Sequence, residues 1–176
     1  PDTLLYFIEP PFPTPNISGM MYLRYGSNVS VSGTDRDHIA PLRERNVAFI
    51  YYMDDGTWKE QAVDKNNVAR ATPRQPIQFE KTISLVDFEI ANPRVQRGEP
   101  IVMLLYWQSA GRIDKDYTVF VHLVDAQGQT VTGIDSQPRQ GKWATSGWRP
   151  NTLMADGMIV PIDANVQPGE YRIELG

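Results

Sequence analysis

The chain has 176 residues and a formal net charge of −4, from 17 Lys and Arg against 21 Asp and Glu. This acidic balance argues against a general nucleic-acid binder, which presents a basic face, so we expect no nucleic-acid partner. Because there is no cysteine and only two histidines, disulfides, thiol chemistry and Cys- or His-rich metal sites are excluded. We expect neither a metal nor a cofactor. The 13 Gly and 14 Pro favour short strands and turns over long helices.

The opening of the chain predicts an extended, non-helical segment. Four prolines lie between residues 10 and 15, and proline lacks an amide donor and biases its neighbour toward extended angles. Residues 20–31 are then rich in β-forming side chains, with Gly26 as the expected turn between them. We therefore predict β structure from Met20 onward.

The next segments predict a short helix, a buried strand and a hairpin. Residues 34–45 can form one or two helical turns, because Thr34 or Asp35 can cap them. The apolar run over 46–53 is typical of a strand that is covered on both faces. The Asp-Gly pair that follows favours a tight hairpin turn, and the polar residues 64–78 predict a linker or a crossover. Residues 1–78 are thus expected to form a small α+β segment.

Residues 79–176 predict an antiparallel β-sandwich of about seven or eight strands. Apolar side chains alternate along several short segments, and turns containing Gly or Pro separate them. One of these segments should place Trp107 in the core. The expected strands cover residues 82–91, 101–109, 117–125, 130–134, 153–162 and 171–175. The predicted fold is mainly β: an immunoglobulin- or jelly-roll-like antiparallel sandwich preceded by the α+β segment.

The long connection over residues 135–149 is the best candidate for a ligand site, because long ordered loops often carry function. Flat aromatic rings stack on the C–H faces of sugars, and planar polar groups beside them bind hydroxyls. The candidate ligand-binding residues are Trp143, Trp148, Asp135, Gln137, Arg139 and His122. Alternatively, the tryptophans close the end of the sandwich and Asp135 anchors the loop through an arginine, while His122 is a half-buried histidine with one satisfied nitrogen. No catalytic residue is predicted, because no nucleophile motif, phosphate loop or acid pair is legible.

The order of motifs in the second part resembles a known family. The motifs are VQRGEPIVMLLYWQ at 95–108, DYTVFVHLVD at 116–125, TSGWRP at 145–150 and PGEY at 168–171. They resemble the C-terminal extracytoplasmic β-domain of bacterial multi-pass glycosyltransferases of the dolichyl-phosphate-mannose protein mannosyltransferase type, found in green non-sulfur bacteria. The resemblance covers roughly residues 79–176 and departs at Ala144, where the family usually has proline.

The resemblance implies that residues 1–78 follow a membrane region and that the chain lies on the extracytoplasmic face of a bacterial membrane. Catalysis would then belong to acidic loops between membrane helices, and this part would be a non-catalytic accessory domain. The implied partners are the membrane-embedded part of the same polypeptide and a glycan, a protein acceptor or a polyprenyl-phosphate sugar. Because Pro1 is not an initiator methionine, we expect a piece of a longer protein. A free-standing carbohydrate-binding module and an independent hydrolase are the alternatives.

Overall fold

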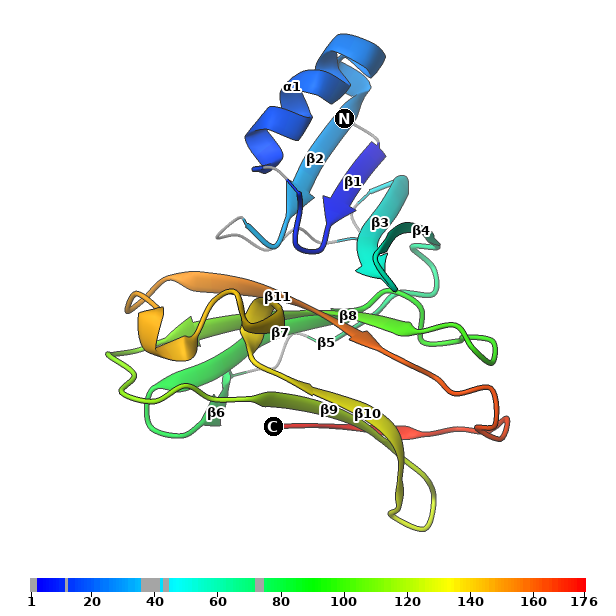
Figure 1. The fold of residues 1–176 in the computed structure, drawn as a ribbon, viewed down its shortest axis with the longest axis vertical. Helices are drawn as coiled ribbons and strands as arrows, with labels where there is room; N and C mark the ends of the chain where they lie inside the picture. Colours follow the sequence, from blue (N-terminus) through cyan, green and yellow to red (C-terminus); the bar gives the residue numbers. More distant parts are fainter. Residues whose placement is uncertain (1–2, 12, 36–41, 43–44, 72–74) are drawn as a thin grey trace.

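The computed structural model describes the chain except for residues 1–2, 12, 36–41, 43–44 and 72–74 (Figure 1). The fold is mainly β, with 45% of residues in strands and 14% in helices, arranged as three sheets and one α-helix in the described part. The predicted mainly β class is therefore confirmed. We name the sheets A, B and C in the order of their first strands.

Sheet A is built on a β-α-β unit and has the strand order β2-β1-β3-β4. Its elements are β1 (Thr3–Phe7), α1 (Thr14–Tyr25), the 3-10 turn η1 (Gly26–Asn28), β2 (Val29–Gly33), β3 (Val47–Asp54) and β4 (Thr57–Val63). Strand β1 pairs in parallel with both β2 and β3, whereas β4 returns antiparallel to β3. Parallel neighbours cannot be joined by a tight turn, so α1 supplies the crossover from β1 to β2.

Helix α1 corrects the prediction of an extended segment around residues 10–15 and of β structure from Met20, because the β structure begins at Val29 in β2. Pro15 lies in the first turn of the helix, where its missing N–H would have no intrahelical partner. Ile17 and Met21, one turn apart, pack against apolar residues of β1 and β2. Gly26 ends the helix with a φ of 72°. This packing, together with the need for a crossover, overrides the β-forming tendency of the segment.

The strand predicted over 46–53 and the hairpin after it are confirmed as β3 and β4. Strand β3 is fully covered on one face and partly covered on the other, where Phe49 and Tyr51 pack against the cluster that includes Ile17 of α1. This corrects the expectation of full cover on both faces. Alternate residues of one face are buried, whereas Val47 and Met53 on the other face are exposed. The short helix predicted over 34–45 falls mostly outside the described residues.

Sheets B and C contain the strands predicted from the second part of the chain. Sheet B has the order β11-β8-β7-β5, with β6 also paired to β7, and sheet C has the order β10-β9-β12. All of these pairs are antiparallel. The segment predicted as a linker contributes β5 and β6 to sheet B. The elements are β5 (Ala69–Ala71), β6 (Ile77–Phe79), β7 (Ile83–Ile90), β8 (Ile101–Ser109), β9 (Val119–Val124), β10 (Thr130–Ser136), η3 (Pro138–Gly141), η4 (Thr145–Gly147), β11 (Leu153–Val160) and β12 (Arg172–Leu175).

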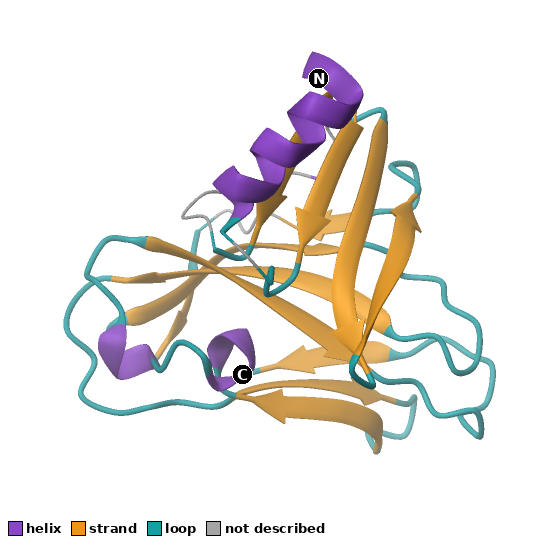
Figure 2. Ribbon diagram, turned by 45° about the horizontal axis from the view of Figure 1, so that its top comes forward, coloured by secondary structure: helices purple, strands orange, loops and turns teal. Residues whose placement is uncertain are grey.

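Strand β8 contributes to two cores, because its two faces are both buried. Val102 and Leu104 belong to the first core, which sheet B shares with sheet A. Met103, Leu105 and Trp107 belong to the second core, which sheet B shares with sheet C. Sheet B is thus the layer between the other two, and sheet A stands on it (Figure 2). The predicted core position of Trp107 is confirmed.

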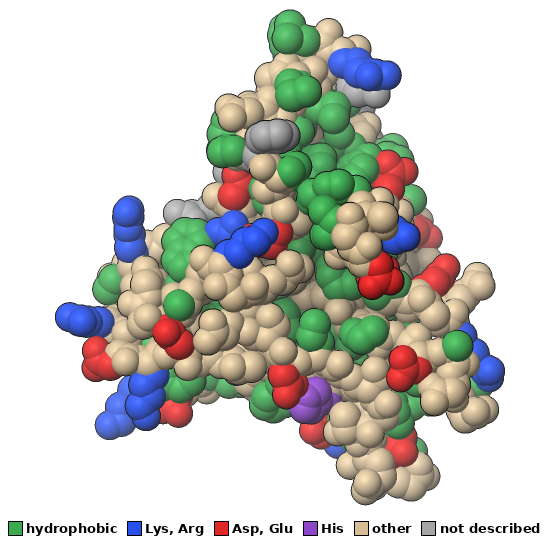
Figure 3. Space-filling view, in the orientation of Figure 1, with side chains coloured by type: hydrophobic (Ala, Val, Ile, Leu, Met, Phe, Trp, Pro, Cys, Tyr) green, Lys and Arg blue, Asp and Glu red, His purple; other side chains and the backbone are tan. Residues whose placement is uncertain are grey.

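The end of the molecule farthest from sheets B and C is formed by the C-terminal part of α1 (Figures 1 and 3). Met20, Tyr22 and Leu23 are exposed there, by 68%, 63% and 87%. Figure 3 shows hydrophobic side chains and a basic side chain at this end. A helix that packs on one sheet leaves other positions open, and near the C-terminal end of α1 three of these carry large apolar side chains.

Gly157 allows β11 to lie directly against the residue that follows β1. A Cβ atom at this position would lie 2.6–2.8 Å from three side-chain carbons of Ile8. We expect Gly157→Ala to lower the free energy of unfolding by about 1–3 kcal/mol through overpacking. Chemical denaturation followed by circular dichroism measures this change in the free energy of unfolding.

The matched control is Gly19→Ala on α1, where nothing lies within 4 Å of the added carbon. That change should be neutral or stabilise the helix by roughly 0.5–1 kcal/mol. In the Ile8→Ala background, which lacks the clashing carbons, Gly157→Ala should cost less than it does in the native chain. If both substitutions change the free energy of unfolding equally, close packing against Ile8 does not explain the need for glycine at position 157.

Candidate functional site

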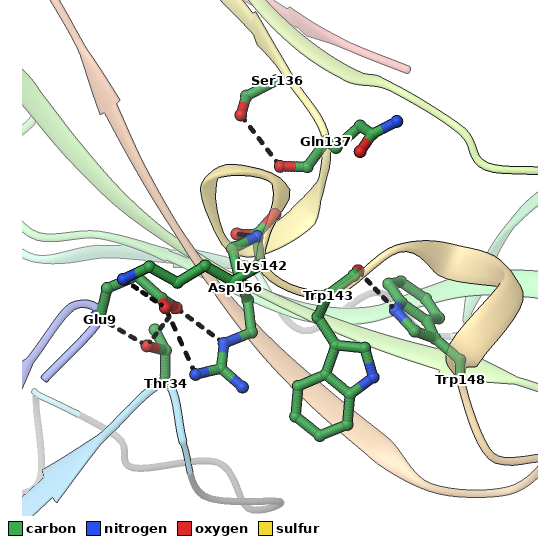
Figure 4. A network of polar contacts seen from close by, with 9 residues as sticks. Glu9, Thr34, Ser136, Gln137, Lys142, Trp143, Trp148 and Asp156 are labelled. Carbon is green, nitrogen blue, oxygen red and sulfur yellow. Dashed lines mark hydrogen bonds and ion pairs between the residues drawn. The ribbon is translucent and has the colours of Figure 1, made fainter. Parts of the chain in front are cut away.

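A buried ion pair ties the loop after β10 to the end of β1 (Figure 4). Arg139 Nε donates to Glu9 Oε1 at 2.7 Å, and Arg139 Nη2 donates to Glu9 Oε2 at 3.4 Å. Lys142 Nζ lies 3.3 Å from Oε2. The Thr34 hydroxyl donates to Oε1 at 2.9 Å and accepts from the Glu9 amide at 2.9 Å. Two cations and a hydroxyl therefore satisfy one buried carboxylate.

The backbone on both sides of this pair adopts conformations that non-glycine residues rarely use. Glu9 has a φ of 50°, and Arg139 and Gln140 both have a φ of 55°. Each such residue costs of order 1–3 kcal/mol unless its surroundings hold it. The Arg139 amide donates to Asp156 Oδ1 at 2.8 Å, so the loop is held through both its backbone and its side chain. We call these four residues, Glu9, Thr34, Arg139 and Asp156, the polar joint.

Asp156 lies on β11 and is almost fully buried. Burial raises the pKa of its carboxyl group to about 6, the Arg139 amide opposes that shift, and the Glu9 charge adds to it. Its Oδ2 has no hydrogen-bond partner among the described residues, and the same holds for the buried hydroxyl of Tyr6. Burial also raises the pKa of the Tyr6 hydroxyl, with negative charge from Glu89 adding to the effect. A polar layer thus lies within the boundary between sheets A and B.

The polar joint occupies the carboxyl ends of the parallel strands β1 and β2. In open α/β sheets this edge is where ligands bind. Here Arg139 reaches it from the loop after β10. Asp35, just beyond β2, accepts hydrogen bonds from the amide (2.9 Å) and hydroxyl (3.2 Å) of Thr14 at the start of α1. Side chains of this chain therefore pair with one another at this edge, and the arrangement connects sheet A to the rest of the fold.

Three of the six predicted ligand-binding residues lie close together in the loop between β10 and β11. Arg139 belongs to the polar joint, and its guanidinium carbon lies 4.9 Å from the centre of a Trp143 ring. Trp148 is buried in the second core, and its Nε1 donates to the backbone oxygen of Trp143 at 3.3 Å. The predicted anchoring arginine is present, but its acidic partner is Glu9 and not Asp135.

The other three predicted residues do not join this cluster. His122 Nε2 and Asp135 Oδ1 lie 2.7 Å apart on paired strands β9 and β10, with Asp135 largely exposed. His122 is half-buried and has one nitrogen paired, as the simpler interpretation predicts. Gln137 is exposed, and its side chain lies apart from the Glu9 cluster (Figure 4). The six predicted residues therefore do not form a single binding site.

A pocket of about 230 Å³ lies between sheets B and C, and Trp148 is among the residues that line it. Its floor is made of buried side chains and its rim of exposed or half-buried residues. The floor residues are Ile83, Trp107, Val119, Thr145 and Trp148, and the rim residues are Phe79, Glu80, Tyr117, Thr118 and Gly176. Trp107 Nε1 is buried without a hydrogen-bond partner among the described residues. An unsatisfied buried donor costs about 1–3 kcal/mol.

Sequence reasoning missed the partners of the polar joint. Glu9 and Arg139 are 130 residues apart, and no local pattern predicts such a pair. Asp156 did carry a signal, because it is an acidic residue inside the apolar run LMADGMIV. A carboxyl group in a buried strand needs a partner, and this requirement could have singled it out. Trp107 was assigned to the core, where its ring lies, but its unpaired N–H could not be foreseen.

Within the described ranges, no three Asp, Glu or His side chains come together in a way that could hold a metal ion. The helical segments in those ranges include none that combines the length and the hydropathy needed to cross a membrane. Comparisons with family models, with curated proteins and with solved structures found no match to this chain.

Proposed function

We propose that this chain is a non-catalytic accessory domain of a membrane-bound bacterial glycosyltransferase, located on the extracytoplasmic face. Sheets B and C would form its β-sandwich, and the membrane-embedded part of the same polypeptide would be its partner. The motif order of residues 79–176 supports the family, and the exposed end of α1 supports a position against the lipid bilayer. That end carries the proposal, because it comes from the structure independently of the resemblance.

The end of α1 combines apolar exposure with a local absence of acidic residues. Met20, Tyr22 and Leu23 are all largely exposed. Arg24 is the only charged residue between positions 14 and 33, although the whole chain has a net charge of −4. Large apolar side chains that gather on a surface usually mark an interaction site. The exposed end of α1 has apolar side chains and no acidic residue. It therefore suits a lipid surface, whereas a basic partner would need acidic residues there.

A lipid surface meets each of these side chains in a favourable way. Met and Leu side chains enter the acyl boundary, and tyrosine favours the headgroup level. The positive charge of this stretch, which has no acidic residue, also favours a surface that carries anionic headgroups. The end of α1 also projects away from sheets B and C (Figure 1), so it can approach a planar surface.

We expect the chain to float with vesicles of phosphatidylcholine and phosphatidylglycerol in a density gradient. The double change Met20→Ser and Leu23→Ser should lower the partition coefficient at least about tenfold, since burying one such side chain is worth about 1.5–3 kcal/mol. The control is Ile77→Ser on β6, which removes an equally apolar side chain that is 44% exposed elsewhere. Flotation that the double variant leaves unchanged would contradict docking by α1.

A free-standing carbohydrate-binding module is the second candidate, and an aromatic cluster on sheet A favours it. The rings of Phe7 and Tyr51 stack with centroids 4.8 Å apart, and Trp58 meets Phe7 edge-on at 6.2 Å. The Tyr51 hydroxyl donates to Glu60, which places a carboxylate beside the rings. The complete native coding sequence separates the candidates. Several apolar spans before Pro1 support the first, and a secreted chain without such spans supports the second.

A further inference from the structure

We infer that the outer face of sheet C binds a neutral pyranose unit of a glycan, which stacks on the rings of Phe120 and His122. The inference goes beyond the proposed function and is independent of membrane docking, because this face and the exposed end of α1 lie at opposite ends of the molecule (Figure 1). The exposure of the face, the arrangement of its rings and the polar groups at its border support the inference separately.

Sheet C presents its outer face to solvent, since no described helix or strand packs on it (Figures 1 and 2). Side chains of a strand alternate between its two faces, and Val119, Val121 and Leu123 of β9 belong to the second core. Phe120 and His122 therefore project outward from the central strand of the sheet, and each is only partly buried. These two rings are thus accessible to a ligand.

Two glycines allow these rings to lie across the sheet. Phe120 exchanges backbone hydrogen bonds of 2.9 and 3.3 Å with Gly176, which follows β12. A Cβ atom at Gly176 would lie 2.5–2.6 Å from Cε1 and Cζ of Phe120, and one at Gly133, the β10 partner of His122, would clash with the His122 ring. The ring centroids are 4.8 Å apart, with 32° between the ring planes. The two rings thus form a shallow aromatic surface that fits the flat C–H face of a sugar.

Polar side chains border the rings on both neighbouring strands. Asp135 lies opposite Phe120 on β10, and Glu174 lies opposite His122 on β12. Their side chains are 63% and 48% exposed, so both can accept hydrogen bonds from ligand hydroxyls. Arg172, which is 66% exposed, can donate to a hydroxyl oxygen.

The charge of this border favours a neutral ligand. Asp135 Oδ1 lies 2.7 Å from His122 Nε2, and Glu174 Oε1 lies 2.7 Å from Arg172 Nη2. Each carboxylate therefore has a basic partner and does not select a cation, whereas an anion would meet two carboxylates. An apolar ligand would cover the border groups without pairing them. A neutral sugar combines a C–H face with hydroxyl groups that both donate and accept.

Saturation-transfer NMR of the intact chain tests the inference with the methyl glycosides of glucose, galactose and mannose. We expect at least one of them to bind with a Kd on the order of 1 mM, with the strongest saturation on its ring C–H protons. Glucosamine and glucuronate add a positive and a negative charge, and neither should bind more tightly than the best methyl glycoside. Absence of binding by all three glycosides, or tighter binding of a charged sugar, would overturn the inference.

Two variants and a control locate the binding. Phe120→Ala removes the stacking surface and should weaken binding of the best glycoside at least about tenfold. Asp135→Ala removes a hydroxyl acceptor and should weaken it at least about threefold. Trp58→Ala is the control, because it removes an aromatic ring that is 39% exposed on sheet A, and it should leave the Kd unchanged.

Circular dichroism shows whether each variant folds. If Phe120→Ala does not fold, Asp135→Ala decides the question, because that position is largely exposed. Unchanged affinity in folded Phe120→Ala or in Asp135→Ala would place the sugar elsewhere. Loss of binding in Trp58→Ala alone would overturn the inference in favour of the aromatic cluster on sheet A.

Discussion

Glu9→Gln is expected to lower the free energy of unfolding by about 3–5 kcal/mol, because it leaves the charge of Arg139 buried without its partner. The two side chains are only 5% and 12% exposed, and their closest atoms lie 2.7 Å apart. The amide keeps the size of the carboxylate and one acceptor oxygen, so loss of charge dominates the effect. Urea denaturation at pH 7, followed by circular dichroism, gives the difference directly.

An exposed pair in the same chain provides the control. Arg172 Nη2 lies 2.7 Å from Glu174 Oε1, but both side chains are about half exposed or more. Glu174→Gln should change stability by about 1 kcal/mol or less, as exposed pairs do. Replacing both Glu9 and Arg139 by Met should be less harmful than Glu9→Gln alone, because no unpaired charge remains. A loss at Glu9 no larger than that at Glu174 would show that burial does not strengthen the pair.

Asp156 should make the fold less stable as the pH rises from about 4 to about 6. Its pKa is about 6 in the folded chain and 3.8 in its ordinary state, so between these values the folded state holds a proton that the unfolded state has released. Stability falls with pH wherever the folded state binds more protons. A shift of about two units corresponds to about 3 kcal/mol. The unfolding free energy of the native chain, minus that of Asp156→Asn, should fall by this amount between pH 4 and pH 7.

Asp116 gives a control with the opposite sign. Hydrogen bonds from the side chain and the amide of Ser146 lower the pKa of its carboxyl group. Its contribution to stability is present above the unfolded pKa and is lost as the pH falls through the folded one. Relative to Asp116→Asn, the native chain should therefore become more stable as the pH rises from the folded pKa of Asp116 toward 3.8, below the range in which Asp156 acts. A flat difference curve for Asp156→Asn would mean that its carboxyl group titrates normally.

The strands of the second part could be predicted because alternation and turn residues are local signals. Residues 101–109 and 153–162 were recognised in this way, and they appear as β8 and β11. Helix α1 was missed because prolines and β-forming residues dominate its local composition. Only the parallel pairing of β1 and β2 requires a crossover helix there, and that pairing is not visible in a short stretch of sequence.

The candidate site was predicted in part. Trp148 and Arg139 were singled out as aromatic and polar groups of one loop, and both are held by contacts that determine the course of that loop. The partners of Arg139 come from β11 and from the end of β1, so sequence separation hid them. Sequence separation also hid the pocket, because its lining residues come from sheet B, sheet C and the loop before β11.

Because β8 lies between two cores, truncation of this protein or its use in chimaeras is restricted. Excising the first 63 residues would strip the cover from Val102, Leu104 and Tyr106, which are buried beneath sheet A. The truncated protein would expose an apolar face of sheet B and would be prone to aggregate. A chimaera that contains the C-terminal half would therefore need either sheet A as well or polar substitutions on this face of sheet B.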